Sequence, residues 1–588
     1  MYRGKYSTLS DFSGGYAGNL PATQVGVNQA YDLDNIVLKP EGKGFRSIHG
    51  NVKHHLALKA IQDITYTAVS LGTAGTVVTV AYTAGGTAGA EVVTVVGSAI
   101  SIKIESGVST ATQVKAAFDA SAAAIALASA AITGTAGTAQ VAAVAAALAI
   151  TALNSGANVQ GIGFLKQADQ DKWLAAIVGA KFYTSSNYSG TWVDSTGAYA
   201  SITAGAAYKW SLMPFNDALI GFGGLQTNPD AAITWTGAGA VAALANAPAA
   251  YGGFTANNRV FAYRTQANPS TIYWCIIGGA TDWTGSGSGS STIGSLSDNQ
   301  TITAAVVIST NYVLVFKENS VHQMVISSAP FPVYSLFNNV GTPGKNSVVN
   351  VDGIVYFITS RGEMRSTNGE TITEYPPLID NLWSTVQPSQ YKNIVGFRES
   401  NMDKDWLVWC VSTTGTSNNL AIIWDLQNKC WLRCSTGYKM NVGAPDDTGE
   451  MYLGDYAGLI YKPDQDSTYA NQSESTTTIT AYWRSGWISP ESLDKIIQVR
   501  KFSVVYEPKT SGDITLAYGY DGIPDSATVA IAQTVASTEV YGQRGTILSG
   551  RGNTFQFKVS QSSSTVDTEI NSLIIAGKAS GQKNQVED

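Results

Sequence analysis

Histidine is the side chain most often used both for acid–base catalysis and for zinc binding, and the sequence contains four: His49, His54, His55 and His322. His54 and His55 are sequence neighbours, which point in different directions on most backbones and rarely share a metal ion. We therefore expect this pair to lie at the surface or in a turn. The signatures GxSxG, HExxH and the Walker loop do not occur in the sequence.

Cysteine could supply a nucleophile, a metal ligand or a disulfide. The four cysteines are Cys275, Cys410, Cys430 and Cys434, and they include no CxxC pair and no histidine at ligand spacing. We interpret them as core thiols rather than as a disulfide or a metal site.

Two further polar stretches have structural interpretations. GAPDDTGE (443–450) contains the pair Asp446 and Asp447 without an EF-hand or a nonapeptide repeat, which favours a turn over calcium binding. GSGSGSS (285–291) is followed by neither a lysine nor a clear helix, which favours a flexible loop over a phosphate site. The sequence thus predicts no catalytic, cofactor-binding or metal-binding residue, and no cofactor.

One stretch could suggest glycosidase chemistry. SSNYSGTW (185–192) resembles the Asp-box hairpin of sialidases, S-x-D-x-G-x-T-W, but Asn187 stands at the acid position and Ser189 at the glycine position. Even a complete Asp box marks a fold and lies away from the active site. The spacing of residues suggests neither an arginine cluster nor a Tyr/Glu nucleophile pair, so a glycosidase remains only a minor alternative.

Six tryptophans stand at the ends of expected strands. We expect them to pack one sheet against the next rather than to form a sugar-binding platform. They are Trp192, Trp235, Trp274, Trp283, Trp424 and Trp431.

Composition limits the class of protein. Only 13% of the 588 residues are charged, about half of the usual share, whereas Gly, Ser, Thr, Ala and Tyr are plentiful. This composition is typical of a turn-rich, mainly β structural protein, and a chain this long is expected to form several domains. The net charge of −7 includes no basic run, which argues against gripping DNA or RNA through phosphates.

The sequence also gives expectations about location. The start, MYRGKYSTLSDFSGG, lacks the apolar stretch of a signal peptide, so we expect synthesis in a cytoplasm. The longest apolar region, around 116–153, is mostly alanine and is interrupted by TGTAGTAQ (133–140), so no membrane span is expected.

Residues 64–160 differ in composition from the rest and predict an inserted small α+β domain. Strands are expected at 76–82, 91–96 and 99–105, followed by a helix capped near Ser109 or Thr110, while 133–157 fits either a helix or strands. Val114, Phe118 and Ile125 are expected on one face of the helix. The charged residues of this range are Glu91, Lys103, Glu105, Lys115 and Asp119.

Residues 161–470 predict a β-propeller, because short strands and polar hairpins recur with a period of about 40–50 residues. That spacing brackets the blade count at roughly six to eight. In SVVNVDGIVYFIT (347–359), Asp352-Gly353 predicts a type I′ hairpin turn. Residues 1–63 are expected to join the propeller, and 471–588 to form a C-terminal β-sandwich with a polar tail.

Three segments together resemble one family, the podovirus-type bacteriophage tail nozzle proteins, also called tail stabilisation or tail tubular proteins. The first segment, 11–51, begins with DFSGG and continues with a pattern whose matching residues are Asp32, Leu33, Asn35, Pro40, Gly42, Arg46 and Gly50. The others, VLVFKENSVHQMVI (313–326) and 340–364, are similar to the propeller core of that family. The resemblance covers most of the chain outside 64–160.

The resemblance implies a structural virion protein without enzymatic activity. Such a protein forms a ring of six copies below the head-to-tail adaptor, retains the genome and conducts double-stranded DNA during ejection without binding it specifically. The implied partners are other copies of the chain, the adaptor or connector, and tail fibres or a needle-like plug. The implied location is the virion tail, after assembly in the cytoplasm of the host bacterium.

Alternatives remain open at this point. Residues 64–160 depart from a minimal nozzle and resemble small decoration-like modules, which could project outward, contact fibres or form a subunit contact. The chain could instead be a receptor-binding or fibre-attachment protein of a tail, or an enzyme acting on surface polysaccharide.

Overall fold

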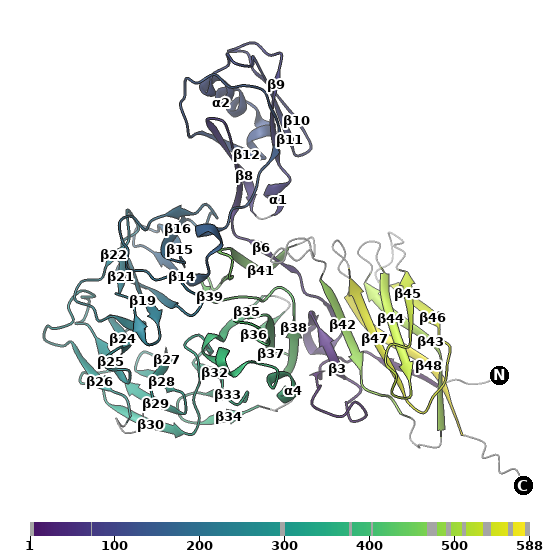
Figure 1. The fold of residues 1–588 in the computed structure, drawn as a ribbon. Helices are drawn as coiled ribbons and strands as arrows, with labels where there is room; N and C mark the ends of the chain where they lie inside the picture. The colour runs from purple at the N-terminus through teal and green to yellow at the C-terminus, as the bar shows by residue number, and fades with distance from the viewer. Residues whose placement is uncertain are drawn as a thin grey trace, which may run out of the picture.

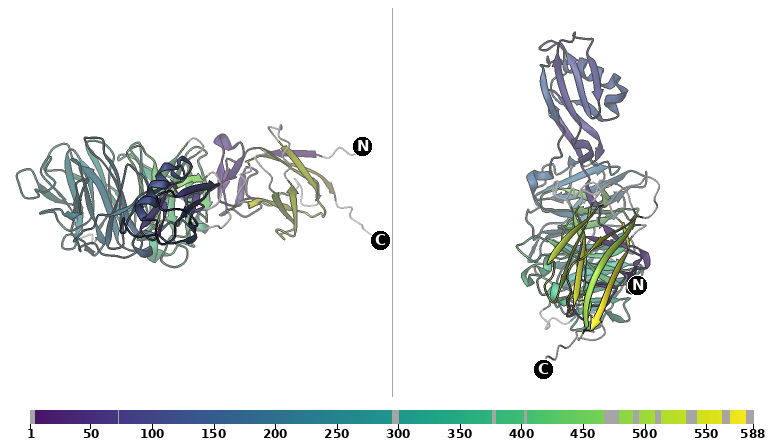
Figure 2. Two further views of the ribbon diagram at one scale, coloured as in Figure 1. Left: turned by 90° about the horizontal axis from the view of Figure 1, so that it is seen from above. Right: turned by 90° about the vertical axis from the view of Figure 1, so that its right-hand side faces the viewer.

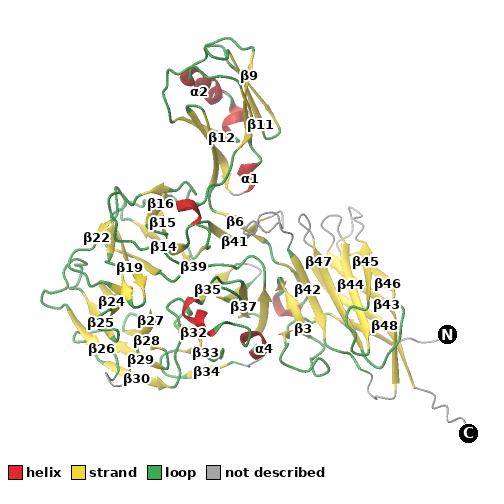
Figure 3. Ribbon diagram, viewed as in Figure 1, coloured by secondary structure: helices red, strands yellow, loops and turns green. Residues whose placement is uncertain are grey.

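The computed structural model describes residues 5–71, 73–294, 300–375, 379–401, 404–466, 479–489, 495–507, 513–532, 542–562 and 569–581. Three units are visible in Figure 1: a β-propeller, a module that stands away from it, and a β-sandwich beside it. Figure 3 shows that nearly all of the regular secondary structure in the propeller and the sandwich is strand. The protein is mainly β, as its sequence predicts.

Within the described residues, the propeller has seven blades, a number inside the predicted bracket. The first four blades follow one another along the chain. They are β14 (Val159–Lys166), β15 (Lys172–Val178), β16 (Lys181–Ser186) and β17 (Val193–Asp194); β18 (Lys209–Phe215), β19 (Ala218–Leu225), β21 (Ile233–Trp235) and β22 (Ala242–Ala243), with β20 (Asn228–Pro229) beside β19; β23 (Ala250–Ala256), β24 (Arg259–Thr265), β25 (Thr271–Trp274) and β26 (Gly289–Thr292); and β27 (Ile302–Val307), β28 (Tyr312–Lys317), β29 (Ser320–Val325) and β30 (Val333–Asn338).

The seventh blade is completed from the N-terminal part of the chain, because β6 pairs antiparallel with β41. The first strand of each blade lies innermost, and β39 of the last blade packs beside β14 of the first, which closes the ring. The remaining blades are β31 (Val348–Val351), β32 (Ile354–Ile358), β33 (Met364–Thr367) and β34 (Ile372–Glu374); β35 (Val395–Ser400), β36 (Asp405–Val411), β37 (Leu420–Asp425) and β38 (Cys430–Cys434); and β39 (Val442–Pro445), β40 (Met451–Gly454), β41 (Ile460–Asp466) and β6 (Gly50–Lys53).

The hairpins follow from local turn chemistry. Asp352 (φ 51°) and Gly353 (φ 85°) join β31 to β32, and the positive φ of both residues confirms the predicted type I′ turn. Asn257 (φ 47°) and Asn258 (φ 55°) join β23 to β24 in the same way. Aspartate, asparagine and glycine tolerate this conformation, whose twist matches that of the flanking strands.

Aromatic residues fill the spaces between neighbouring blades, as predicted for the tryptophans. Trp235 of the second blade lies 5.9 Å, between ring centroids, from Phe182 of the first. Trp424 of the sixth blade lies 5.2 Å from Tyr375, which follows β34 of the fifth. A propeller blade cannot bury both of its faces alone, so these contacts hold the ring together.

The N-terminal segment was expected to join the propeller, but most of it belongs to the sandwich. Only β6 joins a blade, whereas five earlier strands enter the two sandwich sheets. The reason is long-range pairing: β1 lies along β48, and β3 lies along β42, more than 400 residues away in the chain. The five strands are β1 (Lys5–Leu9), β2 (Gly15–Tyr16), β3 (Gln29–Asp34), β4 (Ile36–Leu38) and β5 (Phe45–Ser47), with a 3-10 turn at Pro40–Gly42.

In the described residues, the sandwich consists of two six-stranded sheets, β4-β5-β48-β43-β46 with β1 on β48, and β2-β3-β42-β47-β44-β45. The residues expected to form a C-terminal sandwich therefore do so together with strands from the N-terminal segment. The predicted polar tail lies, after Gly581, outside the described residues. The C-terminal strands are β42 (Thr480–Ser485), β43 (Lys495–Glu507), β44 (Asp513–Tyr520), β45 (Ala527–Ala532), β46 (Gly542–Ile547), β47 (Phe555–Ser562) and β48 (Glu569–Gly581). Short helices at α4 (Asp380–Trp383) and Pro388–Asn393 connect the fifth blade to the sixth.

The inserted module has its own hydrophobic core and stands away from the propeller in the right-hand view of Figure 2. One sheet has the order β10-β11-β9-β13 and the other β12-β8-β7. Its elements are β7 (Leu56–Ile61), β8 (Ile64–Leu71), α1 (Thr73–Thr76), β9 (Thr79–Ala84), β10 (Val92–Val96), β11 (Ala99–Ile104), α2 (Ala111–Ala120), α3 (Ala122–Ile125), β12 (Ala128–Ile132) and β13 (Ala143–Ala147), followed by a 3-10 turn at Leu153–Gly156.

The helix prediction for this module is confirmed at its start and wrong at its end. Thr110 caps α2 in a capping box with Gln113. Val114 and Phe118 are buried, but Ile125 is 47% exposed, because the helix breaks at Ser121 and a separate turn follows. Residues 133–157, whose sequence fits either a helix or strands, contain the strand β13. The module also begins earlier than 64, since β7 pairs with β8.

Candidate functional site

The two neighbouring histidines lie at the junction between the propeller and the inserted module, and both are buried. The prediction of a surface or turn pair is therefore wrong. The backbone N–H of His54 donates to the carbonyl of Ile460 at 2.7 Å, and the N–H of Ile460 donates to Nε2 of His55 at 2.9 Å. Burial, the first cause in each case, lowers the pKa of both imidazoles to about 3. The backbone of His54 and the ring of His55 therefore fix the path by which the chain leaves β6.

The Asp-box-like stretch provides the other half of this junction. The indole N–H of Trp192 donates to the carbonyl of His54 at 2.9 Å, and the N–H of Leu56 donates to the carbonyl of Gly190 at 3.2 Å. Ser185 holds the loop by accepting from the N–H of Gly190 at 3.1 Å. In this chain, the hairpin with the sialidase-like pattern positions the inserted module.

The carboxylate pair has two separate structural roles. Asp446 accepts the backbone N–H groups of Thr448 and Glu450 at 2.8 and 3.0 Å, which confirms the predicted turn. Asp447 accepts the hydroxyl of Tyr188 at 2.9 Å and lies 3.0 Å from the ammonium group of Lys172. Asp447 thereby links the seventh blade to the first.

Other polar and sulfur-containing stretches are also parts of the fold. GSGSGSS was expected to be a flexible loop, but its last three residues belong to β26, and the guanidinium of Arg259 donates to the carbonyl of Gly287 at 2.7 Å. His322 is buried with its ring 3.0 Å from the hydroxyl of Ser320. All four cysteines are buried thiols, as predicted. In the described ranges, no group of three His, Cys, Asp or Glu residues could hold a metal ion.

Two buried lysines cross the centre of the propeller. The amine of Lys345, just before β31 of the fifth blade, donates to the carbonyls of Lys209 at 3.1 Å and Tyr251 at 2.5 Å, in the second and third blades. The amine of Lys209 donates to the carbonyl of Asn441, just before β39 of the seventh blade, at 3.0 Å. The fifth and second blades are not neighbours, so these hydrogen bonds span the ring. Side chains therefore fill its centre at this level.

The electrostatics of this central cluster are unusual. Lys345 and Arg264 lie 4.7 and 5.4 Å from the ring centroid of Tyr251, so two cations face one aromatic ring. Among the described residues, no carboxylate forms an ion pair with Lys209 or Lys345. Burial lowers the pKa of Lys209 to about 7, and burial together with the nearby Lys209 amine lowers the pKa of Lys345.

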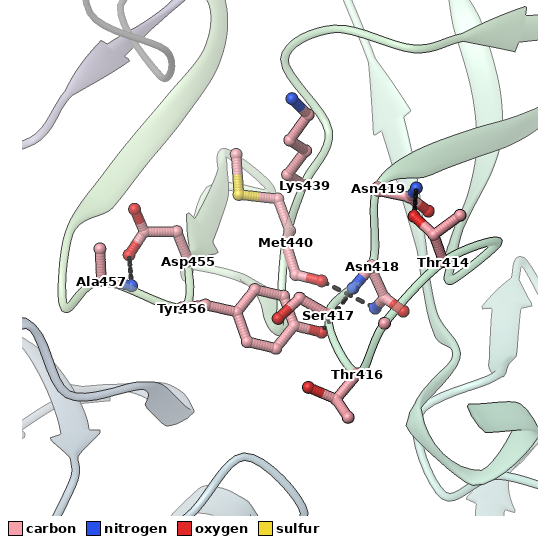
Figure 4. A pocket seen from close by; sticks show the side chains of 11 residues that line it. Thr414, Thr416, Ser417, Asn418, Asn419, Lys439, Met440, Asp455, Tyr456 and Ala457 are labelled. Carbon is pink, nitrogen blue, oxygen red and sulfur yellow. Dashed lines mark hydrogen bonds between the residues drawn. The ribbon is translucent and has the colours of Figure 1, made fainter. Parts of the chain in front are cut away.

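A cavity of about 430 Å³ lies among loops of the sixth and seventh blades (Figure 4). Hydrogen bonds fix its wall: Asn418 donates to the carbonyl of Met440 at 2.9 Å and, through its backbone N–H, to the hydroxyl of Tyr456 at 3.1 Å. The carboxylate of Asp455 accepts the N–H of Ala457 and the hydroxyl of Tyr461 at 2.8 and 3.1 Å. The Asp455 carboxylate lines the cavity, and its hydrogen bonds stabilise the loop between β40 and β41.

The inserted module carries a large share of the exposed apolar side chains. Val92, Val96 and Val144 are 56%, 74% and 89% exposed. These exposed apolar side chains lie on a small unit that has few charged residues. The remaining exposed large apolar residues of the module are Leu58, Val69, Val77, Val108, Ile125 and Val141.

Comparison with known proteins gives no family for this chain. Neither a model of a known protein family nor a curated protein matches the sequence. Solved structures with a similar fold include BamB from Moraxella catarrhalis, with TM-score 0.33, 10% identity, and coverage of 52% of this chain and 83% of that one. YCF48 bound to a D1 peptide has TM-score 0.35, 11% identity, and coverage of 54% and 94%.

A third similar structure is the WD40 propeller domain of Doa1, with TM-score 0.33, 11% identity, and coverage of 54% of this chain and 96% of that one. These likenesses concern the propeller fold alone. No helix among the described residues is long and apolar enough to cross a membrane.

Proposed function

We propose that this protein is a structural subunit of a short bacteriophage tail, the nozzle that forms a ring below the head-to-tail adaptor. In this proposal the chain is not an enzyme. It retains the packaged genome and conducts DNA during ejection, with tail fibres or a plug as further partners. The proposal rests on the resemblance of three sequence segments to the nozzle family and on where the first of these segments lies in the fold.

The observation that carries the proposal is that the family-like motif builds the joint between propeller and sandwich. Leu33 is buried in the core that the two units share. Asn35, held at φ 56°, donates to the carbonyl of Thr480 at 2.9 Å and accepts the N–H of Thr436 at 3.1 Å. One side chain thus contacts both units. This position of the motif supports the proposal of a tail subunit in which the propeller and the sandwich are packed together.

The central cluster of lysines limits where DNA could pass. Because the contact from Lys345 to Lys209 crosses the propeller at 3.1 Å, a duplex has no path along the propeller's own axis at this level. The conduit would instead be the space enclosed by a ring of copies. With a net charge of −7 and no basic run, a lining of neutral or negative potential would repel DNA mildly and allow it to slide.

Electron microscopy with symmetry left free during averaging tests this proposal. The purified protein is imaged alone and mixed with its connector complex. Six-fold rings with an axial channel are the expected result for the mixture with the connector complex, and a channel surface of neutral or negative potential is expected in the reconstruction of these rings. A continuous lining of lysine and arginine would contradict the sliding mechanism.

The second candidate is a receptor-binding or fibre-attachment protein of the tail. The cavity among the loops of the sixth and seventh blades favours it, because hydroxyl and amide side chains such as Thr416, Ser417 and Asn419 line it. Such groups suit a hydroxylated ligand. Propellers that never form a ring with the connector, but bind host glycan saturably, would replace the nozzle proposal with this one.

A further inference from the structure

The strand β10 forms one edge of the larger sheet of the inserted module. Its pairing with β11 is regular, with Val92 opposite Lys103, Thr94 opposite Ser101 and Val96 opposite Ala99. Among the described residues, no strand pairs with the other side of β10. This side therefore presents backbone N–H and C=O groups that a further strand could use.

Edge strands in natural proteins are usually protected by charges, proline or bulges, and β10 has none of these within its length. It reads VVTVV, and every second side chain, from Val92 through Thr94 to Val96, is exposed. Two other edge strands, β13 and β30, differ from β10 because the register of their pairing shifts at a bulge or irregularity. A regular, apolar and uncharged edge is prone to associate unless another strand covers it.

The sequence of β10 is the same in both directions. If two copies pair antiparallel about a two-fold axis at Thr94, Val92 lies opposite Val96 and the two Thr94 residues lie opposite each other. The nearest charged residue, Glu91, would face Gly97, so no like charges would meet across the contact. Because VVTVV is palindromic, each valine of one strand lies opposite a valine of the other.

We propose that β10 binds β10 of a second copy of this chain and forms a two-fold dimer with a continuous eight-stranded sheet. The module favours such a contact because its charges are few and of both signs, so two modules repel each other only weakly. The exposed valines at each end of β10 would be covered by valines of the partner. Backbone hydrogen bonds between the two β10 strands would fix their antiparallel direction and their register.

This dimer does not rest on the nozzle proposal. A two-fold contact is closed and cannot repeat around a ring of six copies. The dimer is therefore the form of the free subunit, in which the edge is covered before the subunit joins any larger assembly.

A disulfide at the two-fold axis tests the contact in the full-length protein. In a Thr94→Cys variant, the two introduced cysteines would lie opposite each other, within the Cα separation of about 4.4–6.8 Å that a disulfide needs. The four native cysteines are buried and give little background. We expect mild oxidation to produce a covalent dimer on a non-reducing gel.

The matched control is Thr83→Cys, an exposed threonine on β9 of the same sheet. Thr83 lies opposite Lys103, which in turn lies opposite Val92, so it is two strands away from the proposed contact. We expect no disulfide-linked dimer from this variant. Equal cross-linking of the two variants would overturn the proposal.

A second pair of variants tests the dimer without cross-linking. Val96→Lys places an ammonium group at the covered edge, whereas Val27→Lys changes a valine of the same 74% exposure in the N-terminal segment. By light scattering after size exclusion, we expect wild type and Val27→Lys to be dimers and Val96→Lys to be a monomer with unchanged circular dichroism. A monomeric wild type, or a dimeric Val96→Lys, would contradict the inference whether or not rings form with a connector.

Discussion

Lys209 and Lys345 bring their amines into the centre of the propeller, where carbonyl and amide oxygens accept their hydrogen bonds. Both side chains are buried and, among the residues that the structure describes, no carboxylate forms an ion pair with either amine, so burial favours the neutral form. His54 and His55 show the same effect at the module junction. At the scale of the residue, groups that could have suggested catalysis or metal binding are buried parts of the scaffold.

Lys209 should make the stability of the protein depend on pH. Its pKa is about 7 in the folded state and about 10.5 when unfolded, so between these values only the unfolded chain binds the proton. Stability from this group therefore rises as pH rises from 7.5 to 9.5, by about 1.4 kcal/mol per pH unit. In urea unfolding, we expect Lys209→Met to lose this slope.

The comparison with wild type is made at each pH, because buried cysteines with raised pKa values, such as Cys410, act in the opposite direction in both proteins. The control is Lys59→Met, which changes an exposed lysine and should keep the wild-type slope. Parallel pH profiles for wild type and Lys209→Met would contradict this, because they would mean that the buried amine keeps its proton in the folded state up to pH 9.5.

His54 should make the stability of the protein depend on pH in the acid range. Its pKa falls from about 6.5 in the unfolded chain to about 3 in the folded one, so only the unfolded chain takes up the proton in this window. Its contribution to stability is complete above pH 6.5 and is lost as pH falls toward 3. His54→Phe keeps an aromatic ring beside Tyr452 and should lose less stability between pH 6.5 and 4.5. Identical acid profiles in thermal unfolding would contradict this.

At the scale of the element, the N-terminal strands decide how the propeller and the sandwich are joined. β3 pairs with β42, and Leu33 of β3 is fully buried in the shared core. Arg433 of β38 lies 3.4 Å from Asp32 and donates to the hydroxyl of Tyr482 at 2.8 Å, so polar contacts also join the sixth blade to the sandwich. The joint is therefore a packed interface and not a linker.

Leu33→Ala should weaken this joint. Removing a fully buried leucine leaves a cavity and costs about 2–5 kcal/mol of unfolding free energy. We expect guanidinium unfolding to show this loss. Val27→Ala, a change at a 74% exposed valine six residues earlier, should stay within about 0.5 kcal/mol of wild type. Equal effects of the two substitutions would show that the shared core does not limit stability.

At the scale of the whole molecule, the protein is a propeller with a sandwich packed against it and a module that has its own core. The module has its own hydrophobic core and enters and leaves the propeller side by side, because Leu58 and Ala149 pair through their backbones. Its boundaries therefore run from Leu56 to about residue 150, not from 64 to 160. The 3-10 turn at Leu153–Gly156 already belongs with the propeller, since Leu153 donates to Gly458 at 2.9 Å.

Replacing residues 57–150 by a short Gly-Ser linker should leave the propeller and sandwich folded. We expect the deletion variant to unfold cooperatively, with a midpoint close to that of wild type, because insertions with their own core fold as separate units. The measurement is denaturant unfolding followed by tryptophan fluorescence, since every tryptophan lies outside 57–150. Loss of the cooperative transition would show that the module supports the ring.

The sequence by itself determined the local structure. The alternation of apolar residues and the turn pair Asp352-Gly353 defined hairpins, the repeat spacing indicated a propeller, and a cap at Ser109 or Thr110 indicated the start of a helix. These features depend on residues within one hairpin or one helical turn, so their physical chemistry is complete in the sequence. The tryptophans at strand ends likewise indicated that neighbouring sheets pack against each other.

The tertiary structure alone decided the burial of His54 and His55, the cluster of Lys209 and Lys345, and the place of the N-terminal strands. Each depends on contacts between residues far apart in the chain, such as Lys345 with Lys209 and β1 with β48. Burial is a property of the completed ring, because a side chain loses water only when the neighbouring blade arrives. That is the physical reason why polar residues that seemed suited to the surface in the sequence lie in the interior of the fold.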